Sequence, residues 1–286
     1  MKYTVVTPVK NEAKFIRFIL DSMIGQSILP EKWIVVDDGS TDNTLEILKE
    51  YSKKYNWISI IENQTHQEER AGGSKVVRAF YKGFDSIKEH NYDFIVKLDG
   101  DLKLPINYFE KVIQTFKANP KVGICGGYIL NKIGNDLIKE IDVDYHVRGA
   151  FKSVRKECFI EIGGFQEIWN WDGLDLMEAM RKGWETKVFD LPVIHFRPTG
   201  SAYNPFKFHF KDGKYAYKLR SSILLHILRS LGRLNKKPYL LCSIIYFFGY
   251  FYAFFKQEKL IIDKELGRFS NKFHTKRIIN LLLKKV

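Results

Sequence analysis

The sequence predicts an α/β fold, a mainly parallel sheet flanked by helices, followed by a basic helical extension. Short apolar runs alternate with longer helical patterns through the first two thirds of the 286-residue chain, which is typical of βαβ units. Two of these runs end in acidic clusters, at residues 37–38 and 99–101. Ligands of open parallel sheets bind beyond the carboxyl ends of the strands, so these clusters mark the expected site.

The first part of the chain alternates strand and helix. Residues 3–9 are apolar and strand-like, whereas residues 12–27 place apolar side chains at helical spacing. Residues 40–42 offer N-caps to a helix that runs to about residue 55. The other elements are expected in this order: strand 34–36, strand 57–61, polar loop 63–73, a helix to about residue 89, and strand 94–96.

The next part adds a hairpin and further helices. A Gly134-Asn135 turn separates two strand patterns within residues 122–145, as expected for a hairpin. Pro105 fits the first turn of a helix. The remaining elements are expected to be a helix at residues 173–183 and strands at 186–190 and 193–197.

The formal net charge of +13 is distributed unevenly. Residues 1–205 carry 28 Lys and Arg against 29 Asp and Glu, whereas residues 206–286 carry 18 against 4. We therefore expect a catalytic domain over residues 1–205 and a basic helical region over residues 206–286. Such an asymmetry indicates an anionic partner surface, either a membrane or a nucleic acid.

The basic region also contains a long apolar run. Residues 214–234 form an amphipathic helix pattern, and the run from Pro238 to Phe255 is uncharged and half aromatic. A spanning helix needs about 20 apolar residues, so this run is slightly short, and aromatic residues prefer the headgroup boundary. We expect residues 206–286 to hold the protein on the anionic cytoplasmic face of the cell membrane, as a peripheral or monotopic protein, and not to bind nucleic acid.

Cysteine usage and the N-terminus point to a reducing compartment. Cys125, Cys158 and Cys242 lie far apart without a C-x-x-C pair, which argues against a disulfide framework or a zinc site. The chain opens on a strand pattern and shows no signal-peptide pattern.

The two acidic clusters suit a nucleotide and a divalent metal. Asp38 could accept hydrogen bonds from a base or ribose, although Asp, Ser and Thr are also favoured there as helix caps. Asp99 and Asp101 offer hard oxygen ligands two residues apart, which suits Mg²⁺ or Mn²⁺ carrying a diphosphate. A simple Asp-Gly turn is the structural alternative, and the spacing of two acidic strand ends favours the metal.

Two basic segments could complete an anion site. Residues 66–75 combine cations with backbone N–H groups at a helix entry, with a solvated loop as the alternative. His195 follows an apolar strand and could ligate a metal, and Arg197 could meet a diphosphate. A lone histidine is more often structural, so this reading depends on its surroundings.

A second pair of carboxylates lies at a predicted helix start. Asp172 and Asp175 stand beside Trp169 and Trp171. A carboxylate there could act as general base toward a hydroxyl, and a tryptophan face could stack on a sugar ring. The structural alternative is an N-cap and a favourable first-turn charge.

Together these motifs resemble the family-2, inverting, nucleotide-sugar-dependent glycosyltransferases with the GT-A fold. The resemblance covers about residues 1–200, is specific for the family, and is hardly specific for the sugar. It implies a nucleoside diphosphate sugar donor, a hydroxyl acceptor and a divalent metal. The segments that carry it are residues 4–12, 34–44, 98–101, 163–165 and 181–184.

The resemblance also implies roles for individual residues. The family usually has Glu-Asp at the start of its catalytic helix, with Asp as base, whereas this chain has Trp171-Asp172 and then Asp175. Counting back from Gly183 aligns Asp172 with the base and leaves Asp175 as the alternative. The donor is expected beside Thr7, Pro8, Glu12, Asp38, Arg70 and Asp99, and the metal on Asp101 and Asp99, with His195 as a further ligand.

The expected reaction is transfer of a glycosyl unit to a hydroxyl with inversion, in surface-polysaccharide or lipid-linked glycan synthesis. One alternative is a sugar-phosphate nucleotidyltransferase, but its Gly-rich phosphate loop is absent from residues 7–12. The other is a non-catalytic module whose basic tail binds a membrane or nucleic acid. The uncharged run within that tail favours lipid.

Overall fold

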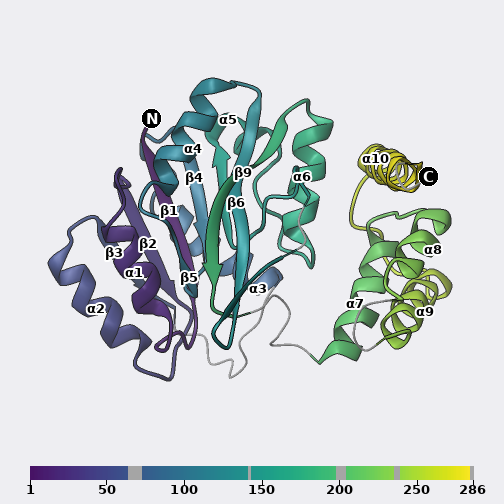
Figure 1. Ribbon diagram of the computed structural model, residues 1–286, viewed down its shortest axis with the longest axis horizontal. Helices are drawn as coiled ribbons and strands as arrows, with labels where there is room; N and C mark the ends of the chain where they lie inside the picture. The colour runs from purple at the N-terminus through teal and green to yellow at the C-terminus, as the bar shows by residue number, and fades with distance from the viewer. Residues whose placement is uncertain (64–72, 141–142, 198–203, 235–238, 284–286) are drawn as a thin grey trace. The chain divides into compact units, whose positions relative to one another are not determined.

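The structure is a computed structural model (Figure 1). It divides into two compact units, Met1–Pro198 and Thr199–Val286, and each unit is described by itself. All three cysteines are buried free thiols. The residues that the structure describes are 1–63, 73–140, 143–197, 204–234 and 239–283.

The described part of the first unit is built on a nine-stranded sheet of order β3-β2-β1-β4-β8-β6-β9-β5, with β7 paired to β6. The run from β3 to β4 is parallel, but β8 is antiparallel to β4 and β6. Strands β6 and β9 are also parallel to each other, so the sheet is mainly parallel, as expected, with antiparallel pairing at β8, β7 and β5. The strands are β1 (Tyr3–Val9), β2 (Lys32–Asp37), β3 (Ile58–Glu62), β4 (Phe94–Leu98), β5 (Leu102–Lys103), β6 (Val122–Ile133), β7 (Asp136–Lys139), β8 (Phe151–Arg155) and β9 (Glu185–His195).

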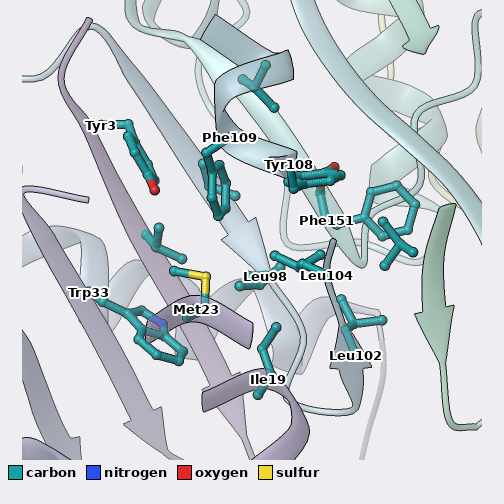
Figure 2. Close-up of a cluster of buried hydrophobic side chains, with 14 of the residues drawn as sticks. Tyr3, Ile19, Met23, Trp33, Leu98, Leu102, Leu104, Tyr108, Phe109 and Phe151 are labelled. Atoms are coloured by element: carbon teal, nitrogen blue, oxygen red, sulfur yellow. The ribbon is translucent and has the colours of Figure 1, made fainter. Parts of the chain in front are cut away.

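Helices cover both faces of this sheet and enclose two apolar cores. Successive side chains of a strand point to opposite faces, so Val5 of β1 joins one core and Val6 joins the other. In the first core Tyr3 stacks on Phe109 (Figure 2), with ring centroids 4.6 Å apart, and on Phe94, with centroids 5.0 Å apart. The first face carries α1 (Ile16–Ile24), α2 (Thr44–Lys54) and α4 (Tyr108–Ala118), and the second carries α3 (Ser74–Asp85), α5 (Lys156–Glu161) and α6 (Trp171–Arg181).

Strand β9 corrects the expectation of two separate strands. Pro192 lies inside it, where a proline usually ends a strand or marks an edge or a bulge. The pairing register of β6 with β9 shifts between Gly126 and Tyr128, next to Pro192. A Cβ on Gly127 would lie 2.2 Å from the Leu191 carbonyl oxygen. The strand continues through the proline because a bulge and a glycine make room for it.

The second unit contains four described helices. Helix α7 starts earlier than expected because the Asn204 side chain caps it, accepting from the N–H groups of the next turn. The single helix expected at residues 214–234 is two helices, since Arg220 has a φ of 54° and Ser222 caps the second. The helices are α7 (Pro205–Lys218), α8 (Ile223–Leu231), α9 (Leu241–Phe255) and α10 (Lys264–Leu283), the last of which was not expected.

Helices α7 and α9 form the centre of this unit. A Cβ on Gly213 would meet the Tyr246 carbonyl oxygen at 2.1 Å, and one on Gly249 would meet the Phe210 carbonyl oxygen at 2.2 Å. The two backbones can approach this closely only because both positions are glycine. Across the described residues, no helix combines the length and apolar character needed to cross a membrane.

Candidate functional site

The loops that follow β1 and β2 are joined by hydrogen bonds. The Asn11 N–H donates to Ser40 Oγ (2.9 Å), and the Asn11 side-chain oxygen accepts from the Thr41 N–H (2.7 Å). The Glu12 N–H donates to Thr44 Oγ1 (2.7 Å). The polar residues after β2 therefore hold the two loops in one arrangement, in addition to any contact with a ligand.

The two carboxylates at the end of β2 differ in their surroundings. Asp37 is buried and accepts from the N–H of Ser40 (3.2 Å) and from its hydroxyl. Asp38 is half-buried and accepts from Asn63 Nδ2. Of this pair, Asp38 is therefore the one placed at the surface, where the nucleotide was expected.

The other expected donor residues have varied positions. Thr7 is fully buried, and its hydroxyl accepts from Trp33 Nε1 (2.8 Å), so this side chain faces the core and not a ligand. Pro8 is half-buried at the end of β1. Arg70 and most of the expected anion-binding segment lie outside the described residues.

Asp101 lies in a cluster of charged side chains. Strand β5 pairs with the end of β9, and the Phe196 N–H donates to the Asp101 carbonyl oxygen (3.0 Å). This pairing brings His195 Nε2 to 3.5 Å and Arg197 Nε to 2.9 Å from Asp101 Oδ2. The Arg197 guanidinium also contacts the buried carboxylate of Glu12. Burial lowers the pKa of Arg197 to about 10, so it stays charged at neutral pH.

The three expected metal ligands do not form one group. Among the described residues, no set of three or more His, Cys, Asp or Glu side chains is arranged to hold a metal ion. Asp101 and His195 lie together, whereas Asp99 is half-buried and its carboxylate contacts Lys97 Nζ. Within the described part of the chain, the buried Nδ1 atom of His195 has no hydrogen-bond partner. One carboxylate and one imidazole fit part of a Mg²⁺ or Mn²⁺ coordination sphere.

Gly100, between Asp99 and Asp101, lies in a closely packed position. A Cβ there would lie 2.8 Å from Val9 Cγ1 and 3.3 Å from Glu12 Cγ. Glycine is required because the Asp-Gly-Asp turn packs directly on the loop after β1.

Asp172 and Asp175 lie in the first turn and a half of α6. Asp175 has a side chain with no exposure, and Lys152 Nζ lies 2.7 and 2.8 Å from its two carboxylate oxygens. Asp172 is half-buried. A Cβ added to Gly149 would lie 2.9 Å from the Cβ of Asp172. Only Asp172 of the two therefore has access to a ligand.

The pKa values of the two carboxylates shift in opposite directions. Burial would raise the pKa of Asp172, but the positive charges of Lys152, His146 and Arg148 outweigh it, and the pKa is lowered. Burial raises the pKa of Asp175 against the charge of Lys152. Asp172 is therefore ionised at neutral pH, as a general base must be.

The tryptophans beside these carboxylates are core residues. Trp169 and Trp171 are each only 6% exposed, so neither offers an open face to a sugar ring, contrary to expectation. The Trp171 ring packs against Phe165, with centroids 4.9 Å apart.

Sequence reasoning missed two buried lysines. Lys97 of β4 is opposite Lys152 of β8 in the antiparallel register, and both are almost fully buried. Lys97 was a visible signal, since a charge inside the apolar run before Asp99 is unusual. Lys152 gave no such signal. The segment Phe151–Arg155 has no strand pattern, so the sequence did not show that it is an internal strand.

Comparison with known proteins identifies the family. Residues 4–166 match the family described as "Glycosyl transferase family 2", and the chain belongs to it. A mannosyltransferase from Pyrobaculum calidifontis, solved in complex with GDP-Man and Mn²⁺, aligns with a TM-score of 0.55 over 88% of this chain and 72% of its own, at 16% identity. That likeness shows the fold, which is the GT-A fold.

Two curated relatives extend the comparison. A dolichyl N-acetyl-α-D-glucosaminyl phosphate 3-β-D-2,3-diacetamido-2,3-dideoxy-β-D-glucuronosyltransferase from Methanococcus voltae is 30% identical over 48% of this chain and 42% of its own length. A poly-β-1,6-N-acetyl-D-glucosamine synthase from Staphylococcus epidermidis is 23% identical over 64% of this chain and 45% of its own. The aligned part of this chain spans less than half the length of each relative.

Proposed function

We propose that this protein transfers a glycosyl unit from a nucleoside diphosphate sugar to a hydroxyl group, with inversion. The observation that carries the proposal is a pair of carboxylates with separate surroundings. Asp101 lies among cationic and metal-ligating side chains, and Asp172 is half-buried at a helix start with a lowered pKa. Family membership supports the same reaction and does not favour a nucleotidyltransferase or a non-catalytic module.

In this mechanism Asp172 accepts the proton of the acceptor hydroxyl while that oxygen attacks the anomeric carbon of the donor. The new glycosidic C–O bond forms as the bond from the anomeric carbon to the diphosphate breaks. The diphosphate leaves with the electron pair, so the configuration inverts and no covalent enzyme intermediate is required. Asp175 cannot fill this role, because Lys152 holds both its oxygens inside the protein.

The donor and the metal are assigned to residues that follow β1, β2 and β4 and to the end of β9. Asp38 and Pro8 border the nucleoside, and Arg70 and Asp99 are further candidates. Glu12 was expected there too, but its buried carboxylate contacts Arg197. Asp101 and His195 would hold Mg²⁺ or Mn²⁺, with Arg197 beside the leaving diphosphate. The metal supplies positive charge that stabilises the diphosphate as it leaves, which is also a role that Arg197 can share.

The acceptor is proposed to belong to a lipid-linked glycan or a surface polysaccharide, by analogy with the names of the two relatives. Helix α9 supports a membrane location. Its apolar stripe recurs at helical spacing and ranges from 40% to 77% exposed; it comprises Leu241, Ile244, Phe248, Tyr252 and Phe255. An exposed apolar stripe in a strongly basic region suits a helix lying in the plane of an anionic leaflet, such as the cytoplasmic face of the cell membrane.

The experiment that tests the reaction uses the purified full-length chain. Each member of a panel of UDP- and GDP-sugars is tested with and without Mn²⁺, for thermal stabilisation and for release of the nucleoside diphosphate. We expect at least one nucleotide sugar to raise the melting temperature in the presence of the metal and to be turned over slowly by water. A chain that binds and turns over none of them would contradict the proposal.

A further inference from the structure

Two lysines lie side by side inside the catalytic unit. Lys97 and Lys152 are opposite each other on β4 and β8, and they are 3% and 0% exposed. Like charges directly opposite across a strand pair are destabilising, and lysine is almost never fully buried unless it is paired. Their Nζ atoms lie 5.6 and 5.2 Å from the centroid of the Trp171 ring, so the indole lies close to both charges.

Each lysine contacts a different carboxylate of the site. Lys97 Nζ contacts Asp99, on the side assigned to the donor. Lys152 Nζ contacts both carboxylate oxygens of Asp175 and donates to the backbone carbonyl oxygen of Asp172 at 2.6 Å. A single ammonium group therefore holds the start of α6 at two points, one of them the residue that carries the base.

We propose that the buried Lys152–Asp175 pair is a positioning device that fixes the backbone of Asp172 and thereby aims its carboxylate at the acceptor. The proposal rests on the proposed function, in which Asp172 is the base. Neither Lys152 nor Asp175 touches a substrate, so they are positioning residues. The pair acts on Asp172 through the hydrogen bond to its backbone and through the charge of Lys152.

The surroundings of Asp172 show why such a device is needed. A Cβ on Gly149 would lie 2.9 Å from the Asp172 Cβ and 2.8 Å from the Trp171 ring, so the helix start packs closely on the Gly149 backbone. The preceding residue, Asn170, has a φ of 60° and provides no side-chain cap. The hydrogen bond from Lys152 to the Asp172 carbonyl oxygen therefore holds a helix start that has no N-cap side chain, although it does not replace a cap, which accepts from backbone N–H groups.

The same pair has a measurable electrostatic consequence. The charge of Lys152 is among the groups that lower the pKa of Asp172, so removing Lys152 should raise the pKa of the base. Burial raises the pKa of Asp175 to about 7, so Asp175 is protonated where Asp172 titrates and Asp175→Asn should leave that titration in place. A pair that only stabilises the fold would leave kcat unchanged in variants that remain folded.

The experiment compares Lys152→Met, Asp175→Asn and the double variant Lys152→Met/Asp175→Leu. The double variant removes both charges and leaves an apolar pair of similar size, a change that is often neutral for stability. Lys156→Met is the matched control, since Lys156 follows the same strand but lies over Tyr92. The full-length chain is assayed for nucleoside diphosphate release from the nucleotide sugar that the wild type turns over, across pH, together with its melting temperature.

We expect Lys152→Met to lower the melting temperature and the double variant to recover most of it. In the double variant kcat should remain at least tenfold below wild type while the donor KM changes less than threefold. The acid limb of kcat/KM should move to higher pH in Lys152→Met and stay in place in Asp175→Asn. Wild-type kcat and pH profile in the double variant would overturn the positioning role.

The single variants decide the question if the double variant does not fold. A wild-type kcat and an unmoved acid limb in Lys152→Met would also overturn the proposal. Failure of the proposed function looks different. In that case the wild type would release no nucleoside diphosphate, or Asp172→Asn would be as active as the wild type.

Discussion

The two units of this protein bury different kinds of side chain. The first unit places charges inside and pairs them, as with Lys152 and Asp175 or Arg197 and Glu12. The second unit buries neutral polar groups such as His226 and Ser243. Most of the exposed large apolar side chains among the described residues also lie in the second unit. Buried ion pairs cost desolvation energy, which suits a site that must hold carboxylates in fixed positions, whereas outward apolar side chains suit a surface that contacts lipid.

The largest expected effect in the first unit comes from a change at Asp172, the proposed base. Asp172→Asn keeps the shape of the side chain but removes its ability to accept a proton, so kcat should fall roughly 10²- to 10⁴-fold. Donor binding and melting temperature should change little. Asp190→Asn, at an exposed position of β9, is the matched control. If Asp172→Asn turns over donor at the wild-type rate, the base lies elsewhere.

The metal side of the site should respond to Asp101 and His195. Asp101→Asn should leave the fold intact and nearly abolish turnover, and His195→Ala should weaken Mn²⁺ binding roughly tenfold or more, by analogy with losses at metal sites. Turnover is measured as release of the nucleoside diphosphate, and the loss of metal affinity is read from a Mn²⁺ titration in the presence of the nucleotide. Full activity after exhaustive chelation, or an unchanged titration in His195→Ala, would remove the metal role of these residues.

The apolar stripe of α9 should matter for lipid and not for chemistry. Replacing Phe248 and Phe255 by Glu should reduce sedimentation with anionic vesicles by roughly a hundredfold in the binding constant, since a buried Phe contributes about 1.5–3 kcal/mol. Donor hydrolysis in solution should be unchanged. The matched control replaces Ile106 and Ile160 of the first unit, which are 67% and 66% exposed. Equal loss in both double variants, or none in either, would end the assignment of the stripe as a membrane face.

The smallest expected effect is a dependence of folding stability on pH, caused by a buried histidine of the second unit. Burial lowers the pKa of His226 to about 4, and the charges of Arg233 and Arg229 add to the effect while Asp212 opposes it. Below its ordinary pKa of 6.5 the unfolded chain binds a proton that the folded chain does not, so stability falls as the pH drops from about 6.5 to about 4. The loss should be on the order of 2 kcal/mol.

Thermal unfolding between pH 7 and pH 4 measures this dependence. The His226 ring stacks on Tyr250 at 4.1 Å between centroids, so His226→Phe keeps an aromatic ring while removing the titration. The pH dependence of the variant should be flatter than that of the wild type. Identical curves for both proteins would show that other groups govern acid unfolding.

The local sequence was enough to predict the family and the GT-A fold, and it also predicts an acid-bearing domain followed by a basic helical region. It could do so because the informative signals are local: apolar runs that end in carboxylates, and a change in charge along the chain. It also placed Asp101 and His195 in one site, since each closes a strand pattern and the carboxyl ends of strands gather at one edge of a sheet.

Only the tertiary structure separated Asp172 from Asp175. Their spacing allows either to be the base, and the difference lies in Lys152, which arrives on a strand that the sequence did not show. Strand β8 was missed because its internal lysine breaks the apolar pattern, and its antiparallel pairing with β4 joins segments far apart in the chain. Burial and pairing of charges depend on such long-range contacts, so they are decided when the sheet closes and not by the residues next to them in sequence.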